Sequence, residues 1–273
     1  MNEKDKRKAQ LLMIKILKEV HSICMKNNIK YFLHFGTLIG AVRHNGFIPW
    51  DDDIDIGMLR PDYEKFLKIV KKNLGKDYIV QNQKTDKGFA FCFTKIMLKD
   101  TVWIEQNSIK TNKKYNGIYI DIFPFDKVPA YAPQRTYFYE ICRLLNYFTL
   151  CKYKINEQKS TDKHALIKKI FITVVPKFIF SHARNLVFKK YKKLTSEYLI
   201  SGLWNKTVKH PLSEDFYKEL VLHRFEDSEF YIPTHYHEVL SAFFGDYMQM
   251  PPESERISHG IIEYDFGKYG DSI

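Results

Sequence analysis

Four aspartates cluster in one short segment, Trp50-Asp-Asp-Asp-Ile-Asp-Ile56. The pattern predicts a β-strand over 50–56, in which Asp51, Asp53 and Asp55 share one face while the isoleucines point into the core. Three carboxylates on one half-buried face repel one another and lose favourable hydration. A divalent cation removes both costs, and magnesium is usually held by one or two carboxylates together with substrate phosphates. The spacing therefore predicts a site for one or two metal ions.

A second predicted strand, 117–123, places another acid among strong strand formers. Its three isoleucines share one face, and Asp121 lies on the other. An acid at that place is costly unless it serves the site, and beside Asp53 and Asp55 it would complete a metal clamp for phosphoryl transfer. The alternatives are a solvated acidic turn after Pro49 or a structural calcium site, and both leave Asp121 unexplained. An EF-hand is excluded, because its glycine and its terminal glutamate are missing.

The run Phe35-Gly36-Thr37 supplies the other half of a phosphate site. A strand that ends in Gly-Thr and opens a helix presents free backbone N–H groups to an anion, and the Thr37 hydroxyl adds a donor or a capping bond. Taken alone, Gly36 and Thr37 are as well explained by helix capping. Arg43, His44 and Lys95 are candidate phosphate ligands, with surface charge as the alternative for each. The sequence contains no P-loop and no Gly-x-Gly-x-x-Gly.

The surrounding periodicity predicts the elements that must carry these residues. Helical stripes favour helices, and short aromatic or β-branched runs favour strands, until about residue 131, where strand signals fade. We expect an α/β or α+β core over the first 128 residues and a mostly helical second half. The expected elements are helices at 8–28, 38–44 and 62–72 and strands at 30–35, 50–56, 78–81, 90–97 and 117–123, the last of them ending at Pro124.

Composition limits the class of protein. The chain has 273 residues, of which 45% are hydrophobic, and its formal net charge is +11, so it can build a core and is not disordered throughout. Four cysteines without a Cys-x-x-Cys pair argue against a disulfide scaffold or a cysteine zinc site and suit a reducing cytosol. The N-terminus is charged and lacks a signal-type apolar block. We expect a soluble or peripheral protein with a polyanionic partner.

The excess positive charge lies in one segment. Residues 163–193 contain nine lysines and arginines and no acid, around an apolar run at 170–180 that is too short to cross a bilayer. Such a segment is typical of an interfacial element on an anionic membrane surface. A buried helix pair with a solvated basic rim is the alternative. Because the rest of the chain is nearly balanced in charge, a nucleic-acid partner is not expected.

The acidic segment and its flanks resemble a known family. The signature of the LicD family of phosphocholine transferases resembles the run His34-Phe-Gly-Thr-Leu-Ile-Gly-Ala-Val-Arg-His-Asn-Gly-Phe-Ile-Pro-Trp-Asp-Asp-Asp-Ile-Asp-Ile-Gly57. Fukutin-related ribitol-phosphate transferases share it more distantly. Further matches lie at Tyr63–Phe66, Ile120–Asp126 and Phe244–Pro252, with His259.

The resemblance implies a nucleotidyltransferase core like that of the polymerase β superfamily, with a mixed sheet in an α+β fold. Carried over by position, Asp53, Asp55 and Asp121 would be the catalytic, metal-binding carboxylates, for Mg²⁺ or Mn²⁺. The other candidate site residues would bind substrate: Gly36, Thr37, Arg43, His44, Trp50, Asp51, Lys95 and His259. A choline head group would also call for aromatic walls, for which the candidates are Trp50, Tyr119, Phe123, Tyr247 and Tyr264.

The resemblance further implies transfer of phosphocholine from CDP-choline to a sugar hydroxyl of a cell-envelope glycan such as teichoic acid or lipooligosaccharide, with release of CMP. A CDP-ribitol or CDP-glycerol donor, or NTP-dependent nucleotidyl transfer, would use the same motifs, and a non-enzymatic nucleic-acid binder is opposed by the three acids. We expect a catalytic core at 1–128, a basic, membrane-facing helical region at 129–210 and a helical region at 211–273 that completes the site. The enzyme would lie at the inner face of the cell membrane, with a lipid-linked glycan as acceptor.

Overall fold

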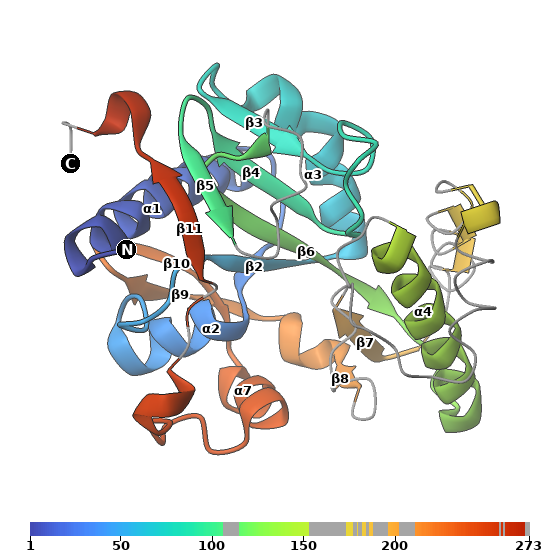
Figure 1. The fold of residues 1–273 in the computed structure, drawn as a ribbon. Coiled ribbons are helices and arrows are strands. Elements are labelled where there is room, and N and C mark those ends of the chain that lie inside the picture. The colour runs from blue at the N-terminus through green and yellow to red at the C-terminus, as the bar shows by residue number, and fades with distance from the viewer. Residues whose placement is uncertain are drawn as a thin grey trace.

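A mixed β-sheet forms the centre of the protein, as seen in a computed structural model (Figure 1). The structure describes residues 1–105, 115–152, 173–176, 179, 182–183, 186–187, 196–201, 211–256, 258 and 260–270. The helical elements are α1 (Glu3–Lys26), α2 (Phe35–Ile39), the π-helix η1 (Gly40–His44), α3 (Arg60–Asn73), α4 (Ala132–Lys152), α7 (Tyr236–Phe244) and the 3₁₀ turns η4 (Glu214–Tyr217), η5 (Glu253–Glu255) and η6 (Gly267–Tyr269). The strands are β1 (Phe32–Leu33), β2 (Asp55–Leu59), β3 (Tyr78–Gln81), β4 (Thr94–Leu98), β5 (Val102–Glu105), β6 (Tyr119–Lys127), β7 (Tyr198–Ser201), β8 (Leu212–Ser213), β9 (Leu220–Phe225), β10 (Ser228–Pro233) and β11 (Ile261–Asp265).

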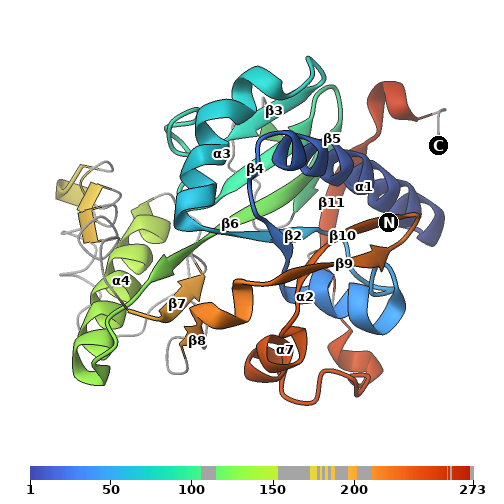
Figure 2. The ribbon, with the colours of Figure 1, turned by 180° about the vertical axis from the view of Figure 1, so that it is seen from behind.

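Strand β6 is the axis of the sheet. The order is β1-β2-β6-β4-β3, with β7 joined to β6 and β8 joined to β7. Only the β2–β6 pair is parallel among the ladders of this sheet that the structure describes. Helices α1 and α3 pack against the sheet, and Figure 2 shows them in front of the same face. This arrangement confirms the expected α+β class and the first-half helices, with α1 beginning earlier because Asn2 caps it.

Four of the five predicted strands have wrong limits. Those expected at 30–35 and 90–97 are shorter, at Phe32–Leu33 and Thr94–Leu98. The strand expected at 50–56 begins only at Asp55 and continues to Leu59, because the ladders to β1 and β6 start there and residues 51–54 have no strand partner in the described sheet. The strand expected to stop at Pro124 continues to Lys127. The Asp121 N–H points toward β2. Because backbone N–H groups alternate in direction along a strand, the nitrogen of Pro124, three residues later, points to the opposite side of β6. On that side the β4 ladder ends at Ile122 and the β7 ladder starts at Phe125, so the missing N–H of Pro124 removes no ladder bond.

The expectation of a mostly helical second half missed five strands, β7 to β11, among the described residues. Strands β9 and β10 form a two-stranded hairpin, β11 pairs with β5, and β7 extends the central sheet beside the C-terminal half of β6. Strands β7 and β11 depend on partners far away in the sequence, β6 and β5, which local periodicity does not report. The division of the chain at 128 and 210 stays a prediction. None of the described helices combines the length and the apolar composition that crossing a membrane requires.

Candidate active site

Three predicted site residues lie in register on adjacent strands. Asp55, the first residue of β2, pairs with Asp121 of the parallel strand β6, and Asp121 pairs in turn with Lys95 of the antiparallel strand β4. The Lys95 Nζ lies 3.0 Å from Asp121 Oδ1 and 3.1 Å from Oδ2. The sheet therefore places a carboxylate, a second carboxylate and an ammonium group in one row.

The backbone of Asp55 is fixed from both sides by the start of α2 and the residue before it. The His34 N–H donates to the Asp55 carbonyl at 2.9 Å, and the Asp55 N–H donates to the Thr37 Oγ1 at 2.8 Å. The Asp121 N–H donates to the carbonyl of Ile54 at 2.8 Å, which holds the second carboxylate against the same point of the chain. Thr37 is thus a buried acceptor for the strand that carries Asp55, and its expected role toward phosphate stays a prediction.

A third acid, Asp51, closely approaches the turn at Gly36. A Cβ added to Gly36 would lie 3.1 Å from Asp51 Oδ2, so the residue at 36 needs to be small for this approach. The Gln10 side chain of α1 donates to the Asp51 carbonyl at 3.0 Å and fixes the loop from the other side. The prediction that Asp51 supports the site is therefore compatible with its place beside Gly36.

The electrostatics show how closely the acids are gathered. Burial raises the pKa of Asp55 well above its usual range, and the charges of Asp53, Asp121 and Asp51 raise it further. Asp55 and Asp121 are only 9% and 8% exposed, so the repulsion is poorly screened by water. The structure therefore brings the three predicted catalytic carboxylates, with Asp51, into one electrostatic cluster.

Asp121 also reveals an acid that the sequence did not indicate. Burial raises the pKa of Asp121 to about 7, Lys95 opposes the shift, and Asp53 and Glu105 add to it. Glu105 is the last residue of β5, which forms a two-stranded sheet with β11. No local motif marks Glu105, because only the packing of β5 brings its charge within range of Asp121.

The Lys95 ammonium is enclosed rather than free in solvent. Its side chain is 13% exposed, and Nζ lies 3.1 Å from the centre of the Tyr119 ring and 5.5 Å from that of Phe93. A carboxylate and aromatic faces are the groups that stabilise an ammonium ion. Lys95 contacts Asp121 here, and its expected role toward phosphate stays a prediction.

The acidic cluster has the donor chemistry that Mg²⁺ and Mn²⁺ prefer, since carboxylate oxygens are hard ligands. Asp121 Oδ1 is buried, and within the described part of the chain it receives no hydrogen bond. Among the residues that the structure describes, no three acidic, histidine or cysteine side chains are arranged as a metal site. The residue types and their mutual repulsion fit a divalent cation.

Arg43 and its neighbours connect the signature segment to the C-terminal region. Arg43 donates to the carbonyls of Tyr247, at 2.5 Å, and Gln249, at 3.3 Å, and its Nε donates to His44 at 3.0 Å. Burial lowers the pKa of both Arg43 and His44.

Trp50 makes a similar long-range contact, with the guanidinium of Arg256 5.1 Å from its ring centre. The expected roles of Arg43, His44 and Trp50 toward substrate stay predictions, and His259 lies outside the described residues.

The aromatic candidates for a choline site are dispersed. Tyr119 faces Lys95, Phe123 packs against Phe35 and Phe93, and the Tyr247 hydroxyl contacts His237. The Tyr264 hydroxyl donates to Asp5 at the start of α1. These contacts assign each ring a structural neighbour and leave the walls of a choline site a prediction.

His34 lies behind the site in an aromatic cluster that the sequence did not reveal. It is fully buried, its ring centre is 3.9 Å from that of Phe35, and rings of Phe125 and Phe243 lie at 4.8 and 5.0 Å. Neither ring nitrogen has a hydrogen-bond partner among the described residues, and burial lowers its pKa to about 3. Phe35 has a positive φ of 46°, an unfavourable conformation for a bulky residue, at the turn that positions Asp55.

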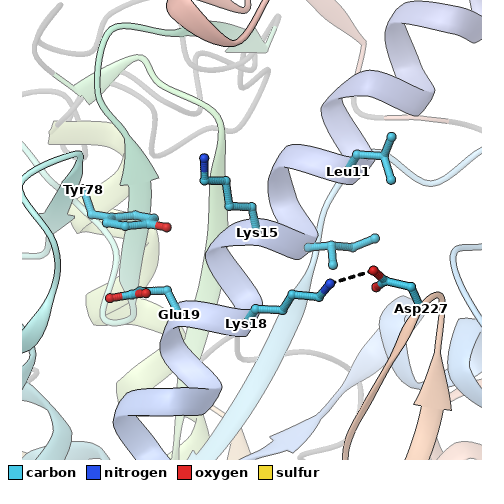
Figure 3. A pocket seen from close by; sticks show the side chains of 7 residues that line it. Leu11, Lys15, Lys18, Glu19, Tyr78 and Asp227 are labelled. Carbon is cyan, nitrogen blue, oxygen red and sulfur yellow. Dashed lines mark hydrogen bonds and ion pairs between the residues drawn. The ribbon is translucent and has the colours of Figure 1, made fainter. Parts of the chain in front are cut away.

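A surface hollow of about 440 Å³ lies elsewhere, along the exposed side of α1 (Figure 3). In it Lys18 pairs with Asp227 from the β9–β10 turn, at 2.7 Å, while Tyr78 of β3 forms the opposite wall. Its lining consists of Leu11, Ile14, Lys15, Lys18, Glu19, Tyr78 and Asp227. None of these residues belongs to the carboxylate cluster.

Comparison with known proteins identifies the family of this chain. Residues 28–143 match the LicD/FKTN/FKRP nucleotidyltransferase domain. The lipopolysaccharide cholinephosphotransferase LicD of Haemophilus influenzae is 31% identical over 268 residues, which cover 94% of this chain and 96% of that protein. An uncharacterized protein of Rickettsia prowazekii is 33% identical over 144 residues, 44% of this chain and 53% of its own. The human ribitol 5-phosphate transferase FKRP is 47% identical over 34 residues, 12% of this chain and 7% of its own. The chain therefore belongs to the LicD family of phosphotransferases.

Proposed function

We propose that this enzyme transfers phosphocholine from CDP-choline to a sugar hydroxyl of a cell-envelope glycan and releases CMP. The observation that carries the proposal is the in-register pairing of Asp55 with Asp121, beside Asp53, in a chain alignable over nearly its whole length with a cholinephosphotransferase. The relative's name specifies lipopolysaccharide as its acceptor. Teichoic acid or lipooligosaccharide is the acceptor class that we propose here.

The chemistry assigns each group a task. The acceptor oxygen attacks the phosphorus that carries choline, the bond to the bridging oxygen of the pyrophosphate breaks, and CMP leaves with that oxygen. Asp53 or Asp121 accepts the proton of the sugar hydroxyl. The N–H groups that open α2 at Gly36, with the Thr37 hydroxyl, would contact donor phosphate.

We propose that Asp53, Asp55 and Asp121 hold Mg²⁺ or Mn²⁺. Bound there, the cation would neutralise charge on the pyrophosphate during transfer. Support comes from the buried, mutually repelling carboxylates and from the Asp121 oxygen that receives no hydrogen bond from the described residues. A cation would remove the repulsion that raises the pKa of Asp55.

A second candidate is the same transfer from CDP-ribitol or CDP-glycerol. The similarity of a 34-residue stretch to ribitol 5-phosphate transferases of human and mouse favours the ribitol donor. The carboxylates and the proposed phosphate-binding groups of the enzyme would act on the pyrophosphate, which all three CDP-linked donors share. The three donors therefore differ only in the head group.

The proposal is tested by donor choice. The purified enzyme is incubated with Mg²⁺ or Mn²⁺, a glycan acceptor and one donor at a time: CDP-choline, CDP-ribitol, CDP-glycerol or CTP. CMP release with CDP-choline above the other donors is the expected result, and a preference for CDP-ribitol would replace it with the second candidate. Pyrophosphate release from CTP alone would overturn the reaction class.

Three variants test the site. Asp53→Asn and Asp55→Asn remove one carboxylate charge each and should reduce kcat at least about a hundredfold, because charge stabilisation in the transition state is lost. Asp227→Asn is the matched control, since that acid lies on the exposed β9–β10 turn and pairs with Lys18. Full turnover by either site variant would overturn the assignment.

We also propose that the basic segment 163–193, most of which lies outside the described residues, attaches the enzyme to an anionic membrane surface on the cytoplasmic side. Its nine basic residues surround a short apolar run. Flotation with liposomes that contain anionic lipid should recover the protein at low salt and release it at high salt. Absence of binding at low salt would overturn the membrane proposal while leaving the transfer reaction unaffected.

A further inference from the structure

The cation nearest to the carboxylate cluster belongs to the protein itself. Lys95 extends from β4 directly opposite Asp121, and Nζ lies 3.0 and 3.1 Å from the two carboxylate oxygens. The hydrogen bond goes to Oδ2, whereas Oδ1 is held by charge alone and receives no hydrogen bond from the described residues. The ammonium group therefore lies against both oxygens of Asp121, and Oδ1, which receives no hydrogen bond from the described residues, is the oxygen that a divalent cation would share.

The surroundings of Lys95 hold its ammonium group in position. The side chains of Lys95 and Asp121 are 13% and 11% exposed, and the Tyr119 ring covers Nζ at 3.1 Å from its centre. The lysine cannot move to a substrate phosphate without uncovering Asp121 among its neighbouring acids. Its charge also reaches Asp55, whose pKa it lowers against the effect of the other carboxylates.

We propose that Lys95 is a fixed cation of the active site, which occupies Asp121 so that the enzyme binds one divalent cation at the cluster rather than two. This inference rests on the proposed function, which assigns metal binding to Asp53, Asp55 and Asp121. A second divalent ion at Asp121 would lie beside an ammonium group in a poorly hydrated site, where repulsion between like charges is strong. The sheet register therefore determines the number of metal ions.

Metal binding without turnover tests the inference. Mn²⁺ is titrated into the full-length protein, free Mn²⁺ is counted by electron paramagnetic resonance, and heats of binding are recorded in parallel. Lys95→Gln removes the charge while retaining a donor for Asp121, and Lys95→Arg retains the charge. Lys15→Gln is a matched control, because Lys15 also lies over a tyrosine ring, 4.6 Å from the centre of Tyr269, but outside the site.

We expect one Mn²⁺ per chain for the wild type, Lys95→Arg and Lys15→Gln, and two for Lys95→Gln, whose first site should also bind about tenfold more tightly or better. Thermal unfolding of Lys95→Gln in EDTA and in Mn²⁺ confirms that the variant is folded, and Mn²⁺ should raise its Tm more than that of the wild type. One ion in Lys95→Gln, at any affinity, overturns the inference and leaves the proposed function intact. A wild type that binds no Mn²⁺ overturns the metal assignment of the proposed function and the inference with it.

Discussion

The fully buried His34 should make the stability of this enzyme depend on pH in a way that one substitution removes. Aromatic rings surround the imidazole, and neither nitrogen has a hydrogen-bond partner in the described part of the structure. Burial therefore disfavours the charged form and lowers the pKa of His34 from 6.5 to about 3. Replacement by leucine, which has a similar volume and no ionisable group, removes this effect.

The size and the sign follow from proton binding in the two states. Below pH 6.5 the unfolded chain binds a proton at His34 that the folded protein excludes until about pH 3, so stability falls as the pH falls through this window. Each pH unit amounts to about 1.4 kcal/mol, so lowering the pH from 6.5 to 5.0 should destabilise the wild type by about 2 kcal/mol through this residue. His34→Leu should lack that loss.

The measurement is urea unfolding of both proteins at pH 7.5 and 5.0, without metal. The difference in unfolding free energy between His34→Leu and the wild type at pH 7.5 reports how well leucine packs, and only its change between the two pH values reports titration. Phe125→Leu is the control, because it alters the same aromatic cluster and carries no proton; its effect should be equal at both pH values.

An equal difference between His34→Leu and the wild type at pH 7.5 and 5.0 would refute the reasoning. The imidazole would then titrate equally in the folded and unfolded states, which is not compatible with a dry aromatic site. A loss of activity in His34→Leu at pH 7.5, with stability retained, would further show that the ring positions the Asp55 backbone more strictly than leucine does.

Three further substitutions test the elements around the site by urea unfolding. Thr37→Val leaves the buried N–H that starts β2 without an acceptor and should cost about 1–3 kcal/mol, whereas Thr37→Ser should retain most of the stability. Arg60→Met leaves Asp126 buried without its two-pronged ion pair and should cost about 3–5 kcal/mol, and the double variant Arg60→Met/Asp126→Leu should regain part of it. Gly57→Ala forces a methyl group against two phenylalanine rings and should cost about 1–3 kcal/mol, while Gly75→Ala, whose Cβ meets only ordinary contacts, should have little effect.

The carboxylate cluster could be predicted because its signal is local. Asp121 is an acid inside an apolar strand, and Asp53 and Asp55 form a close pair, so the alternation of a strand was enough to relate them. The first residue of strand β2, by contrast, could not be predicted from the local sequence. Residues 51–54 alternate as a strand would, but β2 begins only where β1 and β6 are available for pairing, at Asp55.

The β9–β10 hairpin shows why strands of the second half were missed. Its turn, Glu226-Asp227, lacks the glycine or asparagine that signals a tight turn, and Glu226 adopts a positive φ of 61°. Two contacts from distant segments hold it: Arg7 of α1 pairs with both oxygens of Glu226, at 3.0 and 2.5 Å, and the Phe47 N–H donates to it at 3.1 Å. A turn stabilised by residues 219 positions away leaves no trace in local sequence.

The contacts of residues 34–57 explain why the family signature is so much longer than its acidic motif. Within residues 34–57, the aspartates are the carboxylates proposed to bind metal, and other residues of the segment hold them in place. The backbone of His34 and the side chain of Thr37 fix the Asp55 peptide, and Arg43 fastens the segment to the loop at Tyr247. Because a charged row such as Asp55, Asp121 and Lys95 is stable only when each member is held against repulsion, the supporting residues of the segment matter as much as the carboxylates. A variant that keeps every carboxylate but loosens this support should therefore lose activity as severely as one that lacks a carboxylate.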